Sequence, residues 1–213
     1  MTYPSTDFEQ QFWQKDKKLI VGVDEVGRGP LAGPVVAAAV IFSPDIKLIE
    51  GINDSKKVTA KNRLTLSELI KQQALAWAIG SSSVEVINKV GIVPAITLAM
   101  NQAIQQLPGF DQVLIDGNPI KNFSPIDEAN ITYIVKGDQK SYSIASASII
   151  AKVYRDQLME KLSLDFPEYG WNKNMGYGTK EHILAIQRYG LTVHHRELFV
   201  RKLNLSYFSS VIY

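Results

Sequence analysis

The sequence predicts an α/β protein with a mixed central β-sheet flanked by helices, followed by a small C-terminal helical region. Apolar, β-rich runs recur through the first two thirds of the chain. Segments with helical periodicity separate most of these runs, which is the pattern of an α/β domain. Beyond Pro167 the sequence becomes irregular and then helical again. We therefore expect the strands to lie before Pro167 and a helical appendage to follow it.

The first half of the chain supplies three of the predicted strands and one helix. β-rich runs at residues 19–24 and 35–42 are joined by GRGPLAGP, a spacer short enough for a hairpin with a wide loop. Residues 59–74 repeat apolar side chains at helical spacing, and Thr59 is a suitable N-cap. Residues 75–82 are predicted to form the third strand.

The second half supplies two more strands and the longest helix. A helix at residues 93–107 ends at a Pro-Gly pair, and strands are predicted at 112–116 and 131–135. The helix at 143–164 is rich in small side chains, so it could lie very close to a neighbouring surface; ordinary close packing is the alternative explanation. One more helix is predicted at 179–189. This organisation divides the chain into residues 1–166 and an appendage at 167–213; the alternative is to count both as one domain, 1–213.

Composition excludes several classes of protein. The chain of 213 residues has 23 basic and 21 acidic residues, so its net charge of +2 does not by itself indicate a nucleic-acid partner. It has no cysteine, which excludes disulfides, thiolate metal sites and a cysteine nucleophile. The N-terminus lacks the pattern of a secretory signal, and the longest apolar run is too short to cross a bilayer. We expect a soluble, cytoplasmic protein with no membrane partner.

Basic residues concentrate in two parts of the chain. One stretch contains Lys56, Lys57, Lys61 and Arg63, and the C-terminal third contains Lys152, Arg155, Arg196, Arg201 and Lys202. A solvated helix face explains such runs more often than a track for phosphates does. The basic residues therefore leave both interpretations open.

Acidic residues follow three of the predicted strands. Asp24, Asp116 and Asp138 each come directly after an apolar run. Carboxylates that converge from distant parts of a chain repel one another unless a cation neutralises them, and oxygen ligands favour Mg²⁺ or Mn²⁺. Glu25 can join the same site only if the strand ends near Asp24, because consecutive strand residues point to opposite faces. Unrelated surface acids at strand ends are the alternative, which periodicity alone leaves undecided.

Several motifs, in order along the chain, make the sequence similar to a known family. GVDEVGRGPLAGPVV, NDSKK, VLIDGN, VKGD, SIASASIIAKVYRD, NMGYGT and HHRELF together resemble bacterial ribonuclease HII. The resemblance implies an RNase H-like fold and an endoribonuclease that uses divalent metal ions, Mg²⁺ or Mn²⁺. It implies cleavage of the RNA strand of RNA–DNA hybrids and cleavage 5′ of ribonucleotides embedded in duplex DNA, as in ribonucleotide excision repair. The expected products are a 5′-phosphate and a 3′-hydroxyl.

The resemblance also assigns roles to residues. Four carboxylates match the metal ligands of the family, with Asp24 and Asp116 as the expected main ligands and Glu25 and Asp138 completing the site. Gly27, Arg28 and Gly29 match the segment whose backbone reads the 2′-hydroxyl, although GRG alone would indicate a tight turn. Tyr177 matches a tyrosine that contacts the ribose and stacks on the next deoxyribose, whereas an isolated tyrosine is more often packing. Lys56 matches a phosphate contact, and a solvated lysine is nearly as common. Residues 1–166 would then be catalytic and residues 167–213 would bind substrate.

Two other functions are alternatives to this one. A hybrid-binding module without catalysis would be indicated by the loss of any of the four acids, and all four are present. Another RNase H-fold metal-dependent nuclease, such as a junction resolvase, would share the acids but not the residues that distinguish ribose from deoxyribose. Ribonuclease HIII is disfavoured by the short segment before residue 19 and by aspartate at position 138.

Other features complete the expectations. The protein is expected to be a monomer, and its apolar tail, residues 204–213, has no clear sliding-clamp motif and is expected to pack against the domain. Three positions depart from the family's pattern, namely Tyr154, Gly178 and Leu198. A zinc site at His182, His194 and His195 is disfavoured, and a structural or phosphate-side role is preferred.

Overall fold

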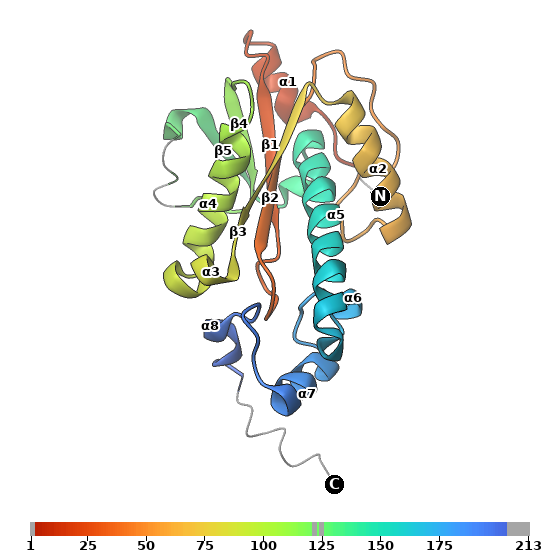
Figure 1. Ribbon diagram of the computed structural model, residues 1–213. Helices are drawn as coiled ribbons and strands as arrows, with labels where there is room; N and C mark the ends of the chain where they lie inside the picture. Colours follow the sequence, from red (N-terminus) through yellow and green to blue (C-terminus); the bar gives the residue numbers. More distant parts are fainter. Residues whose placement is uncertain (1–2, 121–122, 124–125, 204–213) are drawn as a thin grey trace.

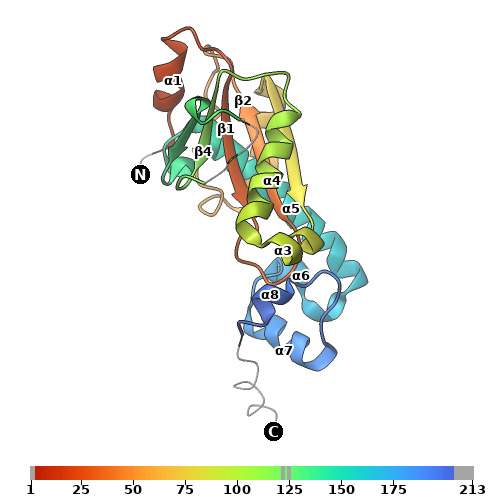
Figure 2. The ribbon, with the colours of Figure 1, turned by 90° about the vertical axis from the view of Figure 1, so that its left-hand side faces the viewer.

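The computed structural model describes residues 3–120, 123 and 126–203. The tail at residues 204–213, for which packing against the domain was predicted, lies outside the described residues. Figures 1 and 2 show one elongated molecule, with a sheet and its helices at one end and the C-terminal helices at the other.

The core of the fold is a five-stranded sheet in the order β3-β2-β1-β4-β5. β1 pairs antiparallel with β2, and β2 pairs antiparallel with β3. β1 also pairs parallel with β4, which pairs parallel with β5. The mixed sheet predicted from the sequence is therefore confirmed. The strands are β1 (Ile20–Val26), β2 (Val35–Ile41), β3 (Ala76–Ser82), β4 (Gln112–Asp116) and β5 (Ile131–Ile134).

The four long helices lie within two residues of their predicted bounds. They are α2 (Ala60–Gln73), α4 (Ile92–Gln105), α5 (Tyr142–Asp165) and α7 (Lys180–Tyr189). Thr59 caps α2 as expected, because its side chain accepts a hydrogen bond from the N–H of Asn62. The short helices are α1 (Asp7–Trp13), α3 (Val84–Val90), α6 (Trp171–Asn174) and α8 (Glu197–Val200). Helices this short complete too few turns for an apolar periodicity to be visible in the sequence.

Helices cover both faces of the sheet. α4 packs on one face, where Val21, Val23 and Ile115 contact Ile96 and Met100 in one buried cluster. α2 and α5 cover the other face, and Figure 1 shows them on the side of the sheet opposite α4. None of the helices in the described ranges is long and apolar enough to cross a membrane.

The small side chains of α5 let it lie against β1 at backbone distance. Gly22 of β1 faces the first turn of α5 so closely that a Cβ at this position would overlap the backbone of Ser143 and Ile144. The close approach expected from the small residues of this helix is therefore observed. It brings the first half of α5 next to the end of β1 that carries the acids.

We expect Gly22→Ala to destabilise the protein by about 2 kcal/mol or more, because the helix backbone must move to admit the methyl group. Urea unfolding of the two proteins measures this difference. An unchanged midpoint would mean that α5 is not held against β1 at this position.

The C-terminal helical region has a buried cluster of its own. Tyr169, Trp171 and Ile183 pack there with Leu31 and Ala32 from the loop that joins β1 to β2. Figure 1 shows α6, α7 and α8 at the end of the sheet where this loop lies. The helices beyond Pro167 therefore pack directly against the GRGPLAGP loop.

Candidate active site

β1 carries the first two acids, and it is longer than predicted. The strand was expected to end at Asp24, but it continues to Val26, and Glu25 pairs with Ala37 in the regular antiparallel register. The proposed turn after Asp24 is therefore wrong. Pairing with β2 keeps the strand extended because each residue of this segment has a partner in β2 as far as Val36.

Asp24 and Glu25 accordingly lie on opposite faces at the end of β1. Asp24 shares the face of Gly22, which α5 covers, and the polar side chain of Ser148 on α5 acts to lower its pKa. Glu25 shares the face of Val23, which α4 covers. The site therefore extends around the end of the sheet instead of lying on one face.

Asp116 and Asp138 reach the same place from the neighbouring strands. Asp116 is the last residue of β4, which runs parallel to β1 with Ile115 opposite Val23. Asp138 follows β5 in a short 3-10 turn, Gly137–Gln139. The Oδ1 atom of Asp116 accepts a hydrogen bond of 2.6 Å from the N–H of Gly137, which ties the two acid-bearing segments together. The carboxyl ends of three parallel strands thus meet at one edge of the sheet.

The site carboxylates, Asp24, Glu25, Asp116 and Asp138, interact electrostatically. Burial raises the pKa of Asp24 well above its usual value, and the charges of the other three raise it further. Burial also raises the pKa of Glu25, an effect that Arg28 opposes and Asp116 increases. Burial raises the pKa of Asp138 to about 6, with contributions from Asp54 and Asp116. Buried, mutually repelling carboxylates are the arrangement that a bound cation would relieve.

Two of the site carboxylates, Asp24 and Glu25, bind groups close to them in the sequence. Within the described residues, no three acidic or histidine side chains form a ready-made cation site. The Oδ1 atom of Asp24 instead accepts from the N–H of Glu25 at 2.7 Å, and Glu25 lies 3.6 Å from the guanidinium of Arg28. These local partners occupy oxygens that a cation would otherwise bind.

The predicted sugar-binding residues lie together beside Glu25. Arg28 and Gly29 are exposed, and a Cβ at Gly29 would meet only the ring of Tyr177, 3.9 Å away. Gly27 has a different reason to be glycine. Its φ is +94°, and a Cβ there would overlap the guanidinium of Arg155. The structure therefore brings GRG and Tyr177 together although about 150 residues separate them in the sequence.

Lys56 lies near the acids, as expected, but a fifth acid, which is itself buried, accompanies it. Burial acts to lower the pKa of Lys56, but attraction to Asp54, Asp24 and Asp138 outweighs it and raises the pKa. Asp54 is 6% exposed and accepts from the N–H of Lys56 at 3.0 Å. Asp54 was not among the predicted site residues, although it is an acid within the NDSKK motif that matches the family.

A hollow of about 480 Å³ adjoins the acids on the α4 face. Glu25, Arg28 and Asp116 line one part of it, and Val93 and Ile96 of α4 line another. Residues 117–120, which follow β4, complete the wall. The site is therefore open to a large ligand next to two of its carboxylates.

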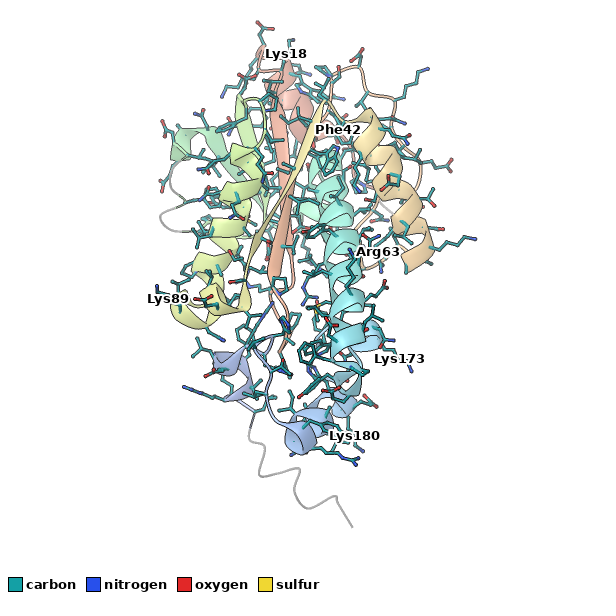
Figure 3. All side chains as sticks on the ribbon, viewed as in Figure 1. Lys18, Phe42, Arg63, Lys89, Lys173 and Lys180 are labelled. Atoms are coloured by element: carbon teal, nitrogen blue, oxygen red, sulfur yellow. The ribbon has the colours of Figure 1, made fainter. Side chains whose placement is uncertain are left out.

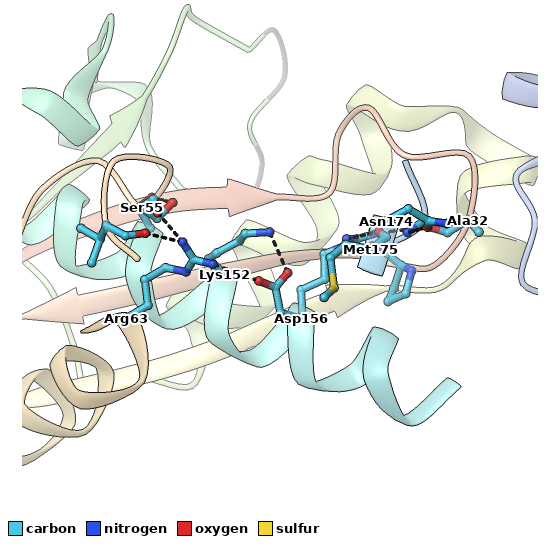
Figure 4. A network of polar contacts seen from close by, with 12 residues as sticks. Ala32, Ser55, Arg63, Lys152, Asp156, Asn174 and Met175 are labelled. Carbon is cyan, nitrogen blue, oxygen red and sulfur yellow. Dashed lines mark hydrogen bonds and ion pairs between the residues drawn. The ribbon is translucent and has the colours of Figure 1, made fainter. Parts of the chain in front are cut away.

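The basic residues divide into exposed and buried groups. Arg63 donates to the carbonyls of Ser55 and Val58 and pairs with Asp156, which also binds Lys152 (Figure 4). Figure 3 shows Arg63 between α2 and α5, and Lys173 on the helical region below. Arg155 and Arg196 are fully buried. Neither a solvated face nor a phosphate track describes these two arginines, so both interpretations are wrong for them.

Two of the three histidines are structural. The N–H of Thr192 donates to Nδ1 of His195, so His195 carries its proton on Nε2 and donates it to Nε2 of His182 at 3.1 Å. Trp171 donates to the same nitrogen of His182, whose Nδ1 then donates to the carbonyl of Tyr177. Burial lowers the pKa of His195 to about 4. The pair is therefore neutral at physiological pH and holds the segment that carries Tyr177.

Comparison with known proteins identifies the family to which the chain belongs. The family model "Ribonuclease HII" matches residues 21–203, which include all the segments just described. The chain belongs to the ribonuclease HII family. A ribonuclease HII of Wolbachia from Brugia malayi is 51% identical over 205 residues, which cover 96% of this chain and 97% of the relative. That of Thermosynechococcus vestitus is 48% identical over 196 residues, covering 92% and 90%. Ribonucleases HII are metal-dependent endoribonucleases that degrade RNA in RNA–DNA hybrids.

A solved structure of the family has the same fold. The RNase HII of Archaeoglobus fulgidus, in its complex with PCNA, has a TM-score of 0.76 to this chain at 24% identity. The likeness covers 88% of this chain and 96% of that one. The RNase H-like fold expected from the motifs of ribonuclease HII is therefore confirmed.

The raised pKa of Asp138 predicts a pH-dependent gain in stability for Asp138→Asn in this ribonuclease HII. A folded-state pKa of about 6, above the usual value of 3.8, means that the native protein holds this proton more tightly than the unfolded chain does. The resulting stability is present below pH 4 and is lost as the pH rises through 6. In EDTA at pH 8, Asp138→Asn should therefore be more stable than wild type by about 1–2 kcal/mol.

Thermal unfolding at pH 8 and near pH 3 measures this effect. The difference between the proteins should nearly disappear near pH 3, below the usual pKa of 3.8, where Asp138 is mostly protonated in both states. A variant that is less stable than wild type at pH 8 would show that Asp138 is not under electrostatic strain.

Proposed function

We propose that this endoribonuclease cuts on the 5′ side of ribonucleotides embedded in duplex DNA, as well as within RNA–DNA hybrids, leaving 5′-phosphate and 3′-hydroxyl ends. The observation that carries this proposal is the contact between two predicted sites. Gly29 lies against Tyr177, and Arg28 lies 3.6 Å from Glu25. A sugar bound at the GRG segment would therefore have its phosphate beside the carboxylates.

We further propose that the site carboxylates hold Mg²⁺ or Mn²⁺. Their oxygens are the donors that hard divalent cations prefer, and the raised pKa values of Asp24, Glu25 and Asp138 give binding of a cation an electrostatic advantage. When bound, such ions activate a water molecule and neutralise charge on the leaving oxygen. The ion pair between Arg28 and Glu25 would break on cation binding, because the Glu25 carboxylate would bind the metal ion in place of the guanidinium.

The remaining site residues would position the substrate. Tyr177 has an exposed ring against which a ribose and the following deoxyribose can pack, and Lys56 supplies a cation for a phosphate next to the acids. In this proposal residues 1–166 carry the chemistry and the helical region beyond them binds the duplex. One chain contains both parts, so we propose that the enzyme acts as a monomer. Its nucleic-acid substrates make ribonucleotide excision repair in the cytoplasm its proposed setting.

A duplex with one ribonucleotide, compared with an all-DNA duplex of the same sequence, tests the proposal. We expect a cut 5′ of the ribonucleotide in Mg²⁺ or Mn²⁺, no cut in EDTA, and no cut of the control. Equal cutting of both duplexes would indicate a nuclease without a sugar test. Binding without cutting would indicate a hybrid-binding module.

A further inference from the structure

Two buried arginines remain unexplained by the proposed chemistry. Arg155 of α5 and Arg196, which precedes α8, are both 0% exposed. Among the residues that the structure describes, neither forms an ion pair with a carboxylate. An unpaired buried charge is strongly unfavourable unless its donors are satisfied. Here every donor nitrogen of both guanidinium groups binds a backbone carbonyl.

Arg196 binds the carbonyls at the start of the GRG loop. Its Nη2 donates to Gly27 at 2.6 Å, its Nη1 to Arg28 at 3.2 Å, and its Nε to Gly33 at 2.9 Å. One guanidinium thus joins the two ends of the loop from its buried side. A lysine at this position would have a single nitrogen and could not reproduce the planar fork.

These contacts fix the direction of two peptide N–H groups. In a planar trans peptide the C=O and the following N–H point in opposite directions. Because Arg196 holds the carbonyls of Gly27 and Arg28 inward, the N–H groups of Arg28 and Gly29 point outward. Neither N–H donates to a backbone acceptor in the described part of the chain. They form a pair of free donors at an exposed turn beside Glu25.

Arg155 extends the same anchoring to the segment of Tyr177. Its Nε and Nη2 donate to the carbonyls of Pro34 and Ala32, both at 3.0 Å, and its Nη1 donates to Met175 at 2.9 Å. Figure 4 shows Ala32 and Met175 side by side at this point. The loop also receives support through its amides, since Leu31 donates to the carbonyl of Gly176 at 2.8 Å. The GRG loop and the segment that carries Tyr177 are therefore both held by the same two guanidinium groups, those of Arg155 and Arg196.

We propose that Arg196, assisted by Arg155, is a positioning residue that holds the N–H groups of Arg28 and Gly29 ready to donate to the sugar–phosphate of the scissile ribonucleotide. The inference rests on the proposed function and goes beyond it in assigning these two residues. A cation on the carbonyl side of each peptide also increases the positive charge of its N–H, which strengthens donation to an oxygen. Preorganised donors of this kind avoid the reorganisation that a mobile loop would require on binding.

Arg196→Lys tests this role on a duplex with one ribonucleotide. In single-turnover reactions with Mg²⁺, well below the melting temperature of the variant, we expect the rate to fall at least about tenfold. The dissociation constant for the duplex should change little, because phosphate contacts elsewhere remain. A folded variant that cuts at the wild-type rate would overturn the proposal, since a purely structural arginine would affect only the melting temperature.

Ile70→Ala provides the matched control. Ile70 is fully buried against α5 in a cluster that contains no residue of the 27–34 loop. Its truncation should lower the melting temperature while leaving the single-turnover rate unchanged. A rate loss of the same size in this control would assign the effect of Arg196→Lys to stability and overturn the proposal.

If Arg196→Lys does not fold, a measurement on the wild-type protein tests the proposal instead. The backbone ¹⁵N order parameters of Arg28 and Gly29 should be near 0.85, the value of rigid backbone, although both residues are exposed. Order parameters below about 0.6 would overturn the proposal. The proposed function is tested separately. It fails if wild type does not cut the duplex at the ribonucleotide, whereas the positioning role alone fails if wild type cuts and Arg196→Lys cuts equally well.

Discussion

Asp116→Asn should abolish cleavage while duplex binding persists. Asp116 ends the strand next to β1 and raises the pKa values of Asp24, Glu25 and Asp138, so it lies within reach of all the other site carboxylates. Asparagine keeps the shape and can still accept from Gly137, but it removes the charge that attracts a divalent cation. We expect a loss of more than about a thousandfold in the cleavage rate, and equal or tighter binding because repulsion of phosphates falls.

Asp127→Asn is the matched control for this substitution. Asp127 caps a 3-10 turn before β5 by accepting from the N–H of Ala129, a role that asparagine also fulfils. Cleavage by this variant should equal that of wild type in an assay on a ribonucleotide-containing duplex. Normal cleavage by Asp116→Asn would contradict the assignment of the metal site.

Gly29→Ala should impair cleavage without affecting stability. A methyl group at Gly29 has room in the free protein, because only the Tyr177 ring lies within 4 Å, at 3.9 Å. The same methyl group would stand between the peptide and a bound ribose. We expect the cleavage rate at a ribonucleotide to fall by about 10- to 100-fold, with a melting temperature within error of wild type.

Gly27→Ala provides the contrasting case for the same assays. Its Cβ would overlap Arg155 and its φ is strained for alanine, so this variant should lose both stability and activity. Full activity of Gly29→Ala would show that the sugar does not approach the backbone at this position.

The fold was predictable because its long elements carry strong local signals. The apolar run from Val35 and the periodic helix after Thr59 were both found at nearly their observed bounds. The end of β1 was not, because the glycines at 27 and 29 suggested an earlier turn. Pairing with the antiparallel strand β2 keeps Glu25 and Val26 in the sheet. This pairing between distant segments cannot be recognised from the local sequence.

The candidate site could be predicted as a set of residues but not as a geometry. The motifs identified the four carboxylates, GRG and Tyr177, and the structure brings these residues together. That Asp24 and Glu25 lie on opposite faces required the strand register. The burial of Arg155 and Arg196 could be seen only in the tertiary structure, because the sequence does not distinguish a buried arginine from an exposed one. Their partners are backbone carbonyls, which every residue has.

Anomalous diffraction from Mn²⁺ is the most direct test of the central claim, that the site carboxylates bind the catalytic cations beside the GRG segment. The crystal should contain the wild-type protein with a duplex in which one ribonucleotide precedes a non-cleavable linkage. We expect manganese peaks bound by oxygens of Asp24, Glu25, Asp116 and Asp138, with the ribose against residues 27–29 and Tyr177. Manganese bound elsewhere, or a ribose held away from this loop, would contradict the claim.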